Sequence, residues 1–153
     1  MKLYKLTDQN GNTRAETNWG ENVTHKATGK GTRLCSDGVI HAYDSPLKAA
    51  LFNPIHGNFK DSLLWESEGD IVVNDHLKVG VKSLTTLRQI PLPEISTEKR
   101  VEFAIRCTLK VYPDARWVKW ACSWLDGSDR SEAAAWAAAR AAEAARAAAW
   151  AAA

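Results

Sequence analysis

The last part of the chain is the most constrained, because it is almost pure alanine. Every residue after Glu132 is alanine except Trp136, Arg140, Glu143, Arg146 and Trp150. Alanine has the highest helix propensity, so residues 128–153 are predicted to be helical even where packing is weak. At about 100° per residue, these five side chains and that of Glu132 share a stripe roughly 120° wide. The remaining surface is methyl groups, which let another backbone approach closely.

The stripe predicts an interface. Trp136 and Trp150 lie two heptads apart, and Glu143 can pair with Arg140 and Arg146 at a spacing of three residues. We expect these five residues to contact a second copy of the chain, or another protein partner. A solvated, partly frayed tail is the alternative. A membrane span is disfavoured, because the charged residues near the middle would cost several kcal/mol in a bilayer.

The first ninety residues carry strand and turn signals instead. Strands are expected over residues 2–6, 34–35, 39–43, 63–68, 71–73, 78–82 and 85–90, with a loop or edge hairpin over 13–30. Asn10-Gly11 and the Ser36-Asp37-Gly38 segment are typical of tight turns. Ser45-Pro46 predicts the start of a short helix over 47–52, which Asn53-Pro54 is expected to end.

Pro91-Leu92-Pro93 marks a boundary, and helical patterns follow it. Ser96 or Thr97 is expected to cap one helix, and Asp114 a second that ends at Gly127. Trp117, Trp120 and Trp124 share one face of the second helix, and such stripes are more often core than interface. The sequence therefore predicts an α+β protein, a small mostly antiparallel sheet followed by three helices. The expected domains are 1–93, 94–127 and 128–153.

Charge and cysteine content bear on the class of protein and on its compartment. The 20 Lys and Arg residues nearly balance the 18 Asp and Glu residues, so charge does not support nucleic-acid binding. Cys35, Cys107 and Cys122 are odd in number and far apart, which favours reduced thiols in a cytoplasm. The polar N-terminal residues do not resemble a signal peptide. No cofactor or membrane association is expected.

Cationic and aromatic residues of the sheet half are the candidate ligand-binding set: Arg33, His41, Tyr43, Lys82 and Arg88. If they converge on one cleft, they suit a phosphate-bearing small molecule, since arginines grip phosphate oxygens and an aromatic ring stacks on a base. The sequence alone does not show convergence.

Catalytic and metal sites are less well supported. The Glu66-Ser67-Glu68 segment with His41 and Tyr43 has the residue types of an ADP-ribosyl-transferring enzyme, in which a carboxylate stabilises the ribosyl cation. His41 can also lie near Cys35 across the Ser36-Asp37-Gly38 turn, as in a Cys-His nucleophile pair. The four histidines show no metal-ligand spacing, and Gly29-Lys30-Gly31-Thr32 lacks the spacing of a phosphate loop. We expect no metal, and a non-catalytic protein more than an enzyme.

Residues 34–47 resemble an uncharacterised domain family carried by phages and prophages. The shared pattern is Leu34-Cys35, a turn glycine, His41, and a proline that opens a short helix. Trp65-Glu66-Ser67-Glu68-Gly69, the Lys-rich strands of residues 78–90 and the Trp- and Ala-rich tail are similar as well. The resemblance implies an accessory protein in the cytoplasm of the phage's host. Such a protein would counter host defence by sequestering a nucleotide-like signal or a defence protein. A structural or protein-inhibitor module using the tryptophan face is a further alternative.

Overall fold

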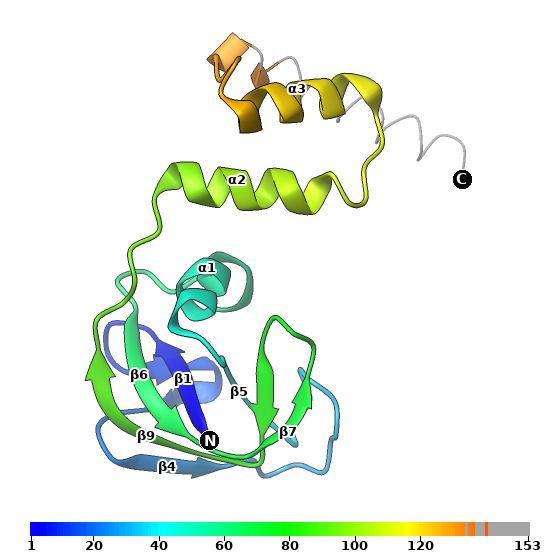
Figure 1. The fold of residues 1–153 in the computed structure, drawn as a ribbon. Helices are drawn as coiled ribbons and strands as arrows, with labels where there is room; N and C mark the ends of the chain where they lie inside the picture. The colour runs from blue at the N-terminus through cyan, green and yellow to red at the C-terminus, as the bar shows by residue number, and fades with distance from the viewer. Residues whose placement is uncertain (134, 137–139, 141–153) are drawn as a thin grey trace. The chain divides into compact units, whose positions relative to one another are not determined.

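A computed structural model describes residues 1–133, 135, 136 and 140 of the chain. The α+β prediction is confirmed: antiparallel sheets occupy the first ninety or so residues, and helices follow (Figure 1). The chain divides into two compact units, Met1–Ile95 (unit 1) and Ser96–Ala153 (unit 2). The separate segment predicted at 128–153 lies mostly outside the described residues.

Unit 1 is built from antiparallel strands and one α-helix. The strands are β1 (Lys2–Thr7), β2 (Asn12–Thr13), β3 (Thr17–Asn18), β4 (Val23–Lys26), β5 (Ile40–Ala42), β6 (Leu63–Glu68), β7 (Ile71–Asn74), β8 (Val79–Val81) and β9 (Ser83–Ile90). The helices are the single 3₁₀ turn η1 (Arg14–Glu16) and α1 (Pro46–His56). One sheet has the order β1-β6-β9-β4, a second has the order β5-β8-β7, and β2 and β3 form a small hairpin.

The two larger sheets are joined at two places. Tyr4 on β1 and Tyr43 after β5 exchange both backbone hydrogen bonds, at 2.8 and 2.9 Å. Lys82 alone separates β8 from β9, so the chain passes from one sheet to the other at this residue. The sheets therefore enclose a shared core.

One strand prediction is wrong. Leu34 and Cys35 lie in a turn rather than a strand, and Cys35 has a left-handed φ of 62° that a strand does not allow. For residues 13–30, predicted as a loop or edge hairpin, the structure has strands: β3 completes the β2–β3 hairpin, and β4 is an edge strand paired with β9.

The predicted end of the first helix is also wrong. Helix α1 continues through Pro54 to His56. Proline lacks an amide hydrogen, but so near the end of a helix its cost is limited, and the last turn still closes when Gly57 N donates to Asn53 O at 2.9 Å. The Asn53 side chain then holds both the amide and the carbonyl of Phe59, at 2.9 and 2.8 Å.

Unit 2 begins with the two helices that the capping residues predict. In α2 (Thr97–Thr108), the Ser96 side chain accepts a hydrogen bond from Lys99 N. In α3 (Ala115–Asp126), Asp114 accepts from the amides of Arg116 and Trp117. Gly127 ends α3 with a φ of 81°, as its position predicts.

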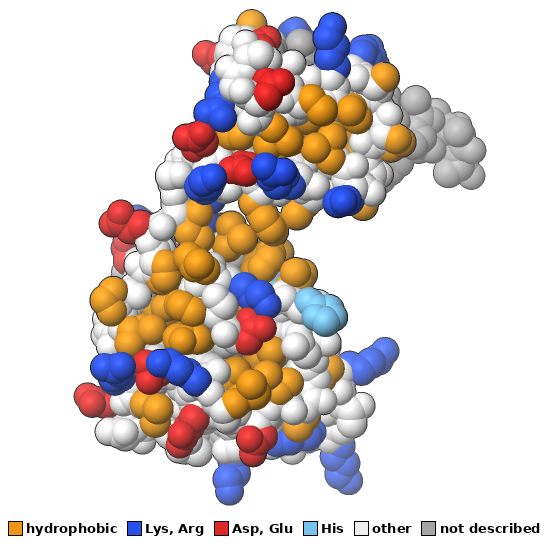
Figure 2. Space-filling model, in the orientation of Figure 1, with side chains coloured by type: hydrophobic (Ala, Val, Ile, Leu, Met, Phe, Trp, Pro, Cys, Tyr) orange, Lys and Arg blue, Asp and Glu red, His pale blue; other side chains and the backbone are white. Residues whose placement is uncertain are grey.

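The tryptophan face of α3 belongs to the core of unit 2. Ile105 of α2 and Trp117 and Ala121 of α3 are buried together, and Trp120 and Trp124 pack against them. On the face of unit 2 drawn in Figure 2, apolar side chains gather into a broad area. The default prediction that the indole stripe is core holds, because the stripe packs against α2.

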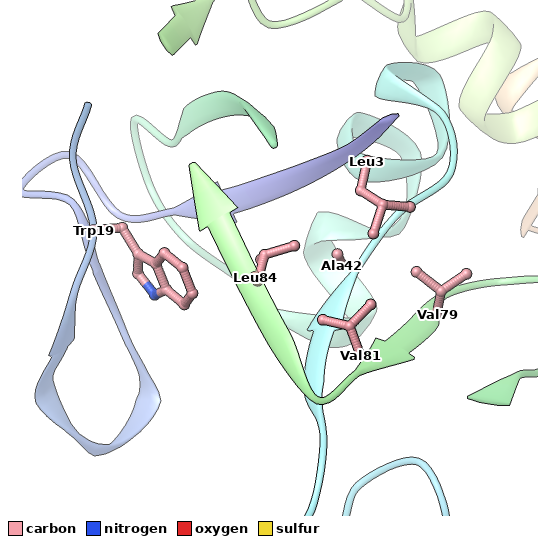
Figure 3. Close-up of a cluster of buried hydrophobic side chains, with 6 residues drawn as sticks. All are labelled: Leu3, Trp19, Ala42, Val79, Val81 and Leu84. Carbon is pink, nitrogen blue, oxygen red and sulfur yellow. The ribbon is translucent and has the colours of Figure 1, made fainter. Parts of the chain in front are cut away.

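The core of unit 1 draws on both sheets. Figure 3 shows its buried side chains, which come from β1, β5, β8, β9 and the segment after β3: Leu3, Trp19, Ala42, Val79, Val81 and Leu84. Burying each valine or leucine side chain of this cluster stabilises the fold by about 1.5–3 kcal/mol. Trp19 lies at one edge of this cluster, and beside it the packing changes from apolar to polar.

Candidate functional site

A pocket of about 640 Å³ opens beside Trp19 in unit 1. Its lining comes from β1, the β2–β3 hairpin, β4, the loop of residues 27–39, β5 and the C-terminal end of α1. A cavity of this size accommodates a small organic molecule.

Lys5 is the most unusual residue in the lining. Leu3, Lys5 and Thr7 alternate onto one face of β1, and Leu3 belongs to the apolar core. Lys5 is only 8% exposed, and its Nζ donates to His41 O at 2.9 Å and lies 5.0 Å from the centre of the Trp19 ring. Among the described residues no carboxylate forms an ion pair with it. Burial lowers the pKa of Lys5 from 10.5 to about 8.

His41 fixes one wall of the pocket. Its Nε2 accepts a hydrogen bond from the backbone amide of Cys35 at 2.8 Å. Burial, followed by the charges of Lys78 and Lys5, lowers the pKa of His41 to about 4, so the ring is neutral at neutral pH. A neutral ring is needed here, because a protonated Nε2 cannot accept from the Cys35 amide.

Cys35 does not form the Cys-His nucleophile pair that the sequence suggested. The residue against its thiol is Lys78, whose Nζ lies 3.2 Å from Sγ, while His41 bonds the Cys35 backbone. The left-handed φ of Cys35 turns the loop so that both contacts are made at the pocket wall.

Tyr43 and His56 form a second polar pair in the lining. Tyr43 Oη and His56 Nδ1 are 3.1 Å apart, and the two rings are stacked with their centroids 6.0 Å apart. Burial raises the pKa of Tyr43 to about 12 and is the main cause that lowers the pKa of His56. At neutral pH both groups are uncharged, and the pair can donate or accept a proton.

Positive charge predominates around the pocket. Four of the lining residues are basic: Lys5, Arg14, Lys26 and Lys78. Within the part of the chain that the structure describes, Asp37 is the acidic residue of the lining, and its Oδ1 already accepts a hydrogen bond from Gly31 N at 3.2 Å. Trp19, Tyr43 and Phe59 add aromatic rings. The lining therefore suits an anion that carries an apolar or flat group.

The loop of residues 27–39 closes one side and is tightly folded on itself. Lys82 Nζ donates to Gly31 O and Gly38 O, at 3.1 and 2.7 Å, which ties these two positions of the loop together. A Cβ built on Gly38 would lie 1.9 Å from Gly31 O, so a side chain does not fit there. The loop needs glycine at this close approach.

The structure brings together only part of the predicted ligand-binding set. His41 and Tyr43 both line the pocket. Lys82 donates hydrogen bonds to the backbone of the loop of residues 27–39. Arg88 pairs with Glu66 at 3.1 Å on the β1-β6-β9-β4 sheet. Arg33 lies in the loop, where its carbonyl accepts from Ser36 Oγ, and is not part of the lining.

The constellation proposed for ADP-ribosyl transfer is not assembled in the pocket. Glu68 is an exposed residue of β6, and Glu66 is held by Lys2 and Arg88. Neither carboxylate lines the cavity that contains His41.

Sequence reasoning missed several residues of the site: Lys5, Arg14, Trp19, Lys26, His56 and Lys78. A signal existed for Lys5 alone, as a lysine that shares a strand face with Leu3. The others meet through loops and through pairing of distant strands, which one sequence does not specify.

The predicted tail interface is mostly outside the described residues. Trp136 is 60% exposed, and its Nε1 donates to Glu132 Oε1 at 3.2 Å. Arg140 is exposed and helical. Glu143, Arg146 and Trp150 lie outside the described residues, so assembly through this segment stays a prediction.

No cluster of three or more His, Cys, Asp or Glu side chains among the described residues has the arrangement of a metal site. No helix there has the length and apolar character that crossing a membrane requires.

Comparisons with protein-family models, curated proteins and solved structures found no match to this chain. The resemblance to phage accessory proteins thus rests on the sequence motifs alone and stays a prediction. The pocket is therefore the feature of this chain from which a function can be inferred.

Proposed function

We propose that unit 1 binds a small, nucleotide-like anion carrying a flat ring in the pocket around Lys5, and that the protein acts by holding this molecule. The observation that carries the proposal is the imbalance of charge in the lining. Lys5, Arg14, Lys26 and Lys78 line a cavity in which Asp37 is the acidic residue of the described lining. A bound anion would offset the repulsion among these cations.

The buried amine supports the same conclusion. Taking an unpaired ammonium out of water costs several kcal/mol, and here a backbone carbonyl and the Trp19 ring compensate only in part. A phosphate oxygen reaching Lys5 would supply the missing counter-charge. A fold retains such a costly group most readily where a ligand uses it.

The contacts inside the pocket favour holding a ligand over converting it. His41 Nε2 is occupied by the Cys35 amide, and the carboxylates of β6 are elsewhere. The indole stripe of α3 serves the core of unit 2, so the pocket is better supported as a working surface than the tryptophan face.

The resemblance to phage accessory proteins supplies a setting for this proposal. In that setting the protein would sequester a nucleotide-like signal of host defence, in the host cytoplasm, with one site for each chain. Assembly through the C-terminal segment is not required for this binding.

Calorimetric titration of the full chain with adenosine monophosphate, adenosine and inorganic phosphate tests the proposal. We expect the monophosphate to bind and adenosine to bind at least about tenfold more weakly, because the phosphate contacts are charge-assisted. Lys26→Ala should weaken binding of the monophosphate, whereas Lys60→Ala, at an exposed position outside the lining, should not. Equal binding of adenosine and its monophosphate, or no binding of either phosphate compound, would contradict the proposal.

A further inference from the structure

The Lys5 amine is placed to react as well as to attract. It lies in the wall of a cavity, 8% exposed, between a backbone carbonyl and an indole ring. In the part of the chain that the structure describes, no acidic side chain pairs with it. Ordinary lysines extend into water, where the ammonium form is strongly favoured.

We propose that Lys5 captures a phosphate-bearing aldehyde or ketone, such as the open-chain form of a phosphorylated sugar, as a reversible imine. This inference rests on the proposed function, and it narrows the ligand to anions that also carry a carbonyl carbon. The cationic lining holds the phosphate, and the amine bonds the carbonyl.

The protonation of Lys5 supports this chemistry. An amine attacks only as the neutral base, and burial lowers the pKa of Lys5 to about 8. At pH 8 the neutral fraction is then on the order of 100-fold larger than for an ordinary lysine. A neutral amine that donates one N–H to His41 O keeps its lone pair for a carbonyl carbon in the pocket.

The step is balanced without an oxidant or reductant. The nitrogen lone pair forms the C–N bond, the carbonyl electrons move to oxygen, and a proton passes from nitrogen to that oxygen. The hydroxyl then takes a second proton and leaves as water while the C=N bond forms. Tyr43 and His56, a hydrogen-bonded pair in the same lining, can relay these protons.

The test uses pyridoxal 5′-phosphate as the probe, because it combines a phosphate, a flat ring and an aldehyde. The full chain is incubated with the probe, reduced with borohydride, digested and mapped by mass spectrometry. We expect Lys5 to be labelled at least about tenfold faster than Lys2, an exposed lysine on the same strand. Adenosine monophosphate should slow labelling of Lys5 and leave Lys2 unchanged.

Controls separate this inference from the proposed function. Lys5→Arg keeps the charge and should lose the selective label, with folding checked by circular dichroism. Pyridoxal without the phosphate should label Lys5 more slowly. If Lys5 reacts no faster than Lys2 in the unaltered chain while adenosine monophosphate binds, imine capture is wrong and anion binding stands. If pyridoxal and its phosphate label Lys5 equally fast, the amine is reactive and the anion site is wrong.

Discussion

The two units bury different kinds of side chain. Unit 2 buries Ile105, Trp117 and Ala121, and its helices are set by ordinary caps at Ser96 and Asp114. Unit 1 has an apolar core as well, yet beside it the fold buries the Lys5 amine and Tyr43 and half-buries His41 and His56. The comparison teaches where to look for function, because a fold that needed only stability would not place Lys5 next to Leu3.

Removing the largest buried ring of unit 2 gives the largest expected effect. Trp117→Ala should destabilise unit 2 by about 3–5 kcal/mol, because it leaves a cavity between α2 and α3. Hydrogen exchange should show lost amide protection in α2 and α3 and retained protection in β1 and β6. Lys119→Ala, exposed on the same helix, is the control. Equal loss of protection in both units would mean that they unfold as one, which would break the comparison.

The opposite sign is expected for the buried amine of unit 1. Lys5→Met should stabilise unit 1 by up to about 3 kcal/mol at pH 7, because the pKa of Lys5 is about 8 in the folded chain against an ordinary 10.5. Between these two pH values the unfolded chain binds the extra proton, so stability of the unaltered chain rises with pH. The advantage of the variant should therefore shrink above pH 8 and vanish near pH 10.5.

Urea unfolding of both chains at a series of pH values measures this difference. Lys2→Met, at an exposed position of the same strand, is the matched control and should show no such trend. A Lys5→Met variant that is less stable than the unaltered chain at pH 7 would show that the amine serves the fold, and the contrast between the units would weaken.

Acid should affect unit 1 through His41 by a smaller amount. The folded pKa of His41 is about 4, below its ordinary 6.5, so the unfolded chain binds the proton first as pH falls. Stability is then lost between about pH 6.5 and pH 4. The ring is partly exposed, so the loss should be about 1 kcal/mol. His41→Gln keeps an acceptor for the Cys35 amide, and its unfolding curves should depend less on pH over this range.

The smallest effect concerns the left-handed backbone conformation, which unit 2 adopts at a glycine and unit 1 at a cysteine. Gly127 ends α3 with a φ of 81°, whereas Cys35 adopts a φ of 62° with a side chain present. Cys35→Gly should change stability by less than about 1 kcal/mol, in the stabilising direction, while Gly127→Ala should cost about 1 kcal/mol. Thermal unfolding of the two variants checks both signs. A destabilising Cys35→Gly would show that the Lys78 contact outweighs the backbone strain.

Local signals explain what the sequence could predict. Alternating strands, the Ser96 and Asp114 caps and the indole spacing of α3 each act within a few residues, and the structure confirms them. The failures come from side-chain contacts and backbone conformations that residue type alone does not specify. Helix α1 runs past Pro54 because Asn53 holds the following loop, and the strand predicted at 34–35 is a turn because of the φ of Cys35.

The site was predictable only through two residues that lie two positions apart in one segment of the chain. His41 and Tyr43 share a face of one segment and do line the pocket together. Arg88 pairs with Glu66 and Lys82 bonds to the backbone of Gly38, because strand pairing and the loop of residues 27–39 set their neighbours. Lys78 contacts Cys35, which lies 43 positions earlier in the sequence, and no local pattern predicts such a contact.

The close approach of Gly31 and Gly38 limits which substitutions this protein can accept during evolution. Loops are ordinarily the part of a domain that accepts new side chains most freely. Here a single methyl group at Gly38 would clash with the backbone of Gly31, and the Lys82 amine donates to the carbonyls of both glycines at once. In a library of all single substitutions, residues 29–38 should tolerate fewer replacements than the exposed faces of β4 and β7. Variation in what the pocket accepts is therefore more accessible through Arg14 and Lys26 than through the loop that encloses it.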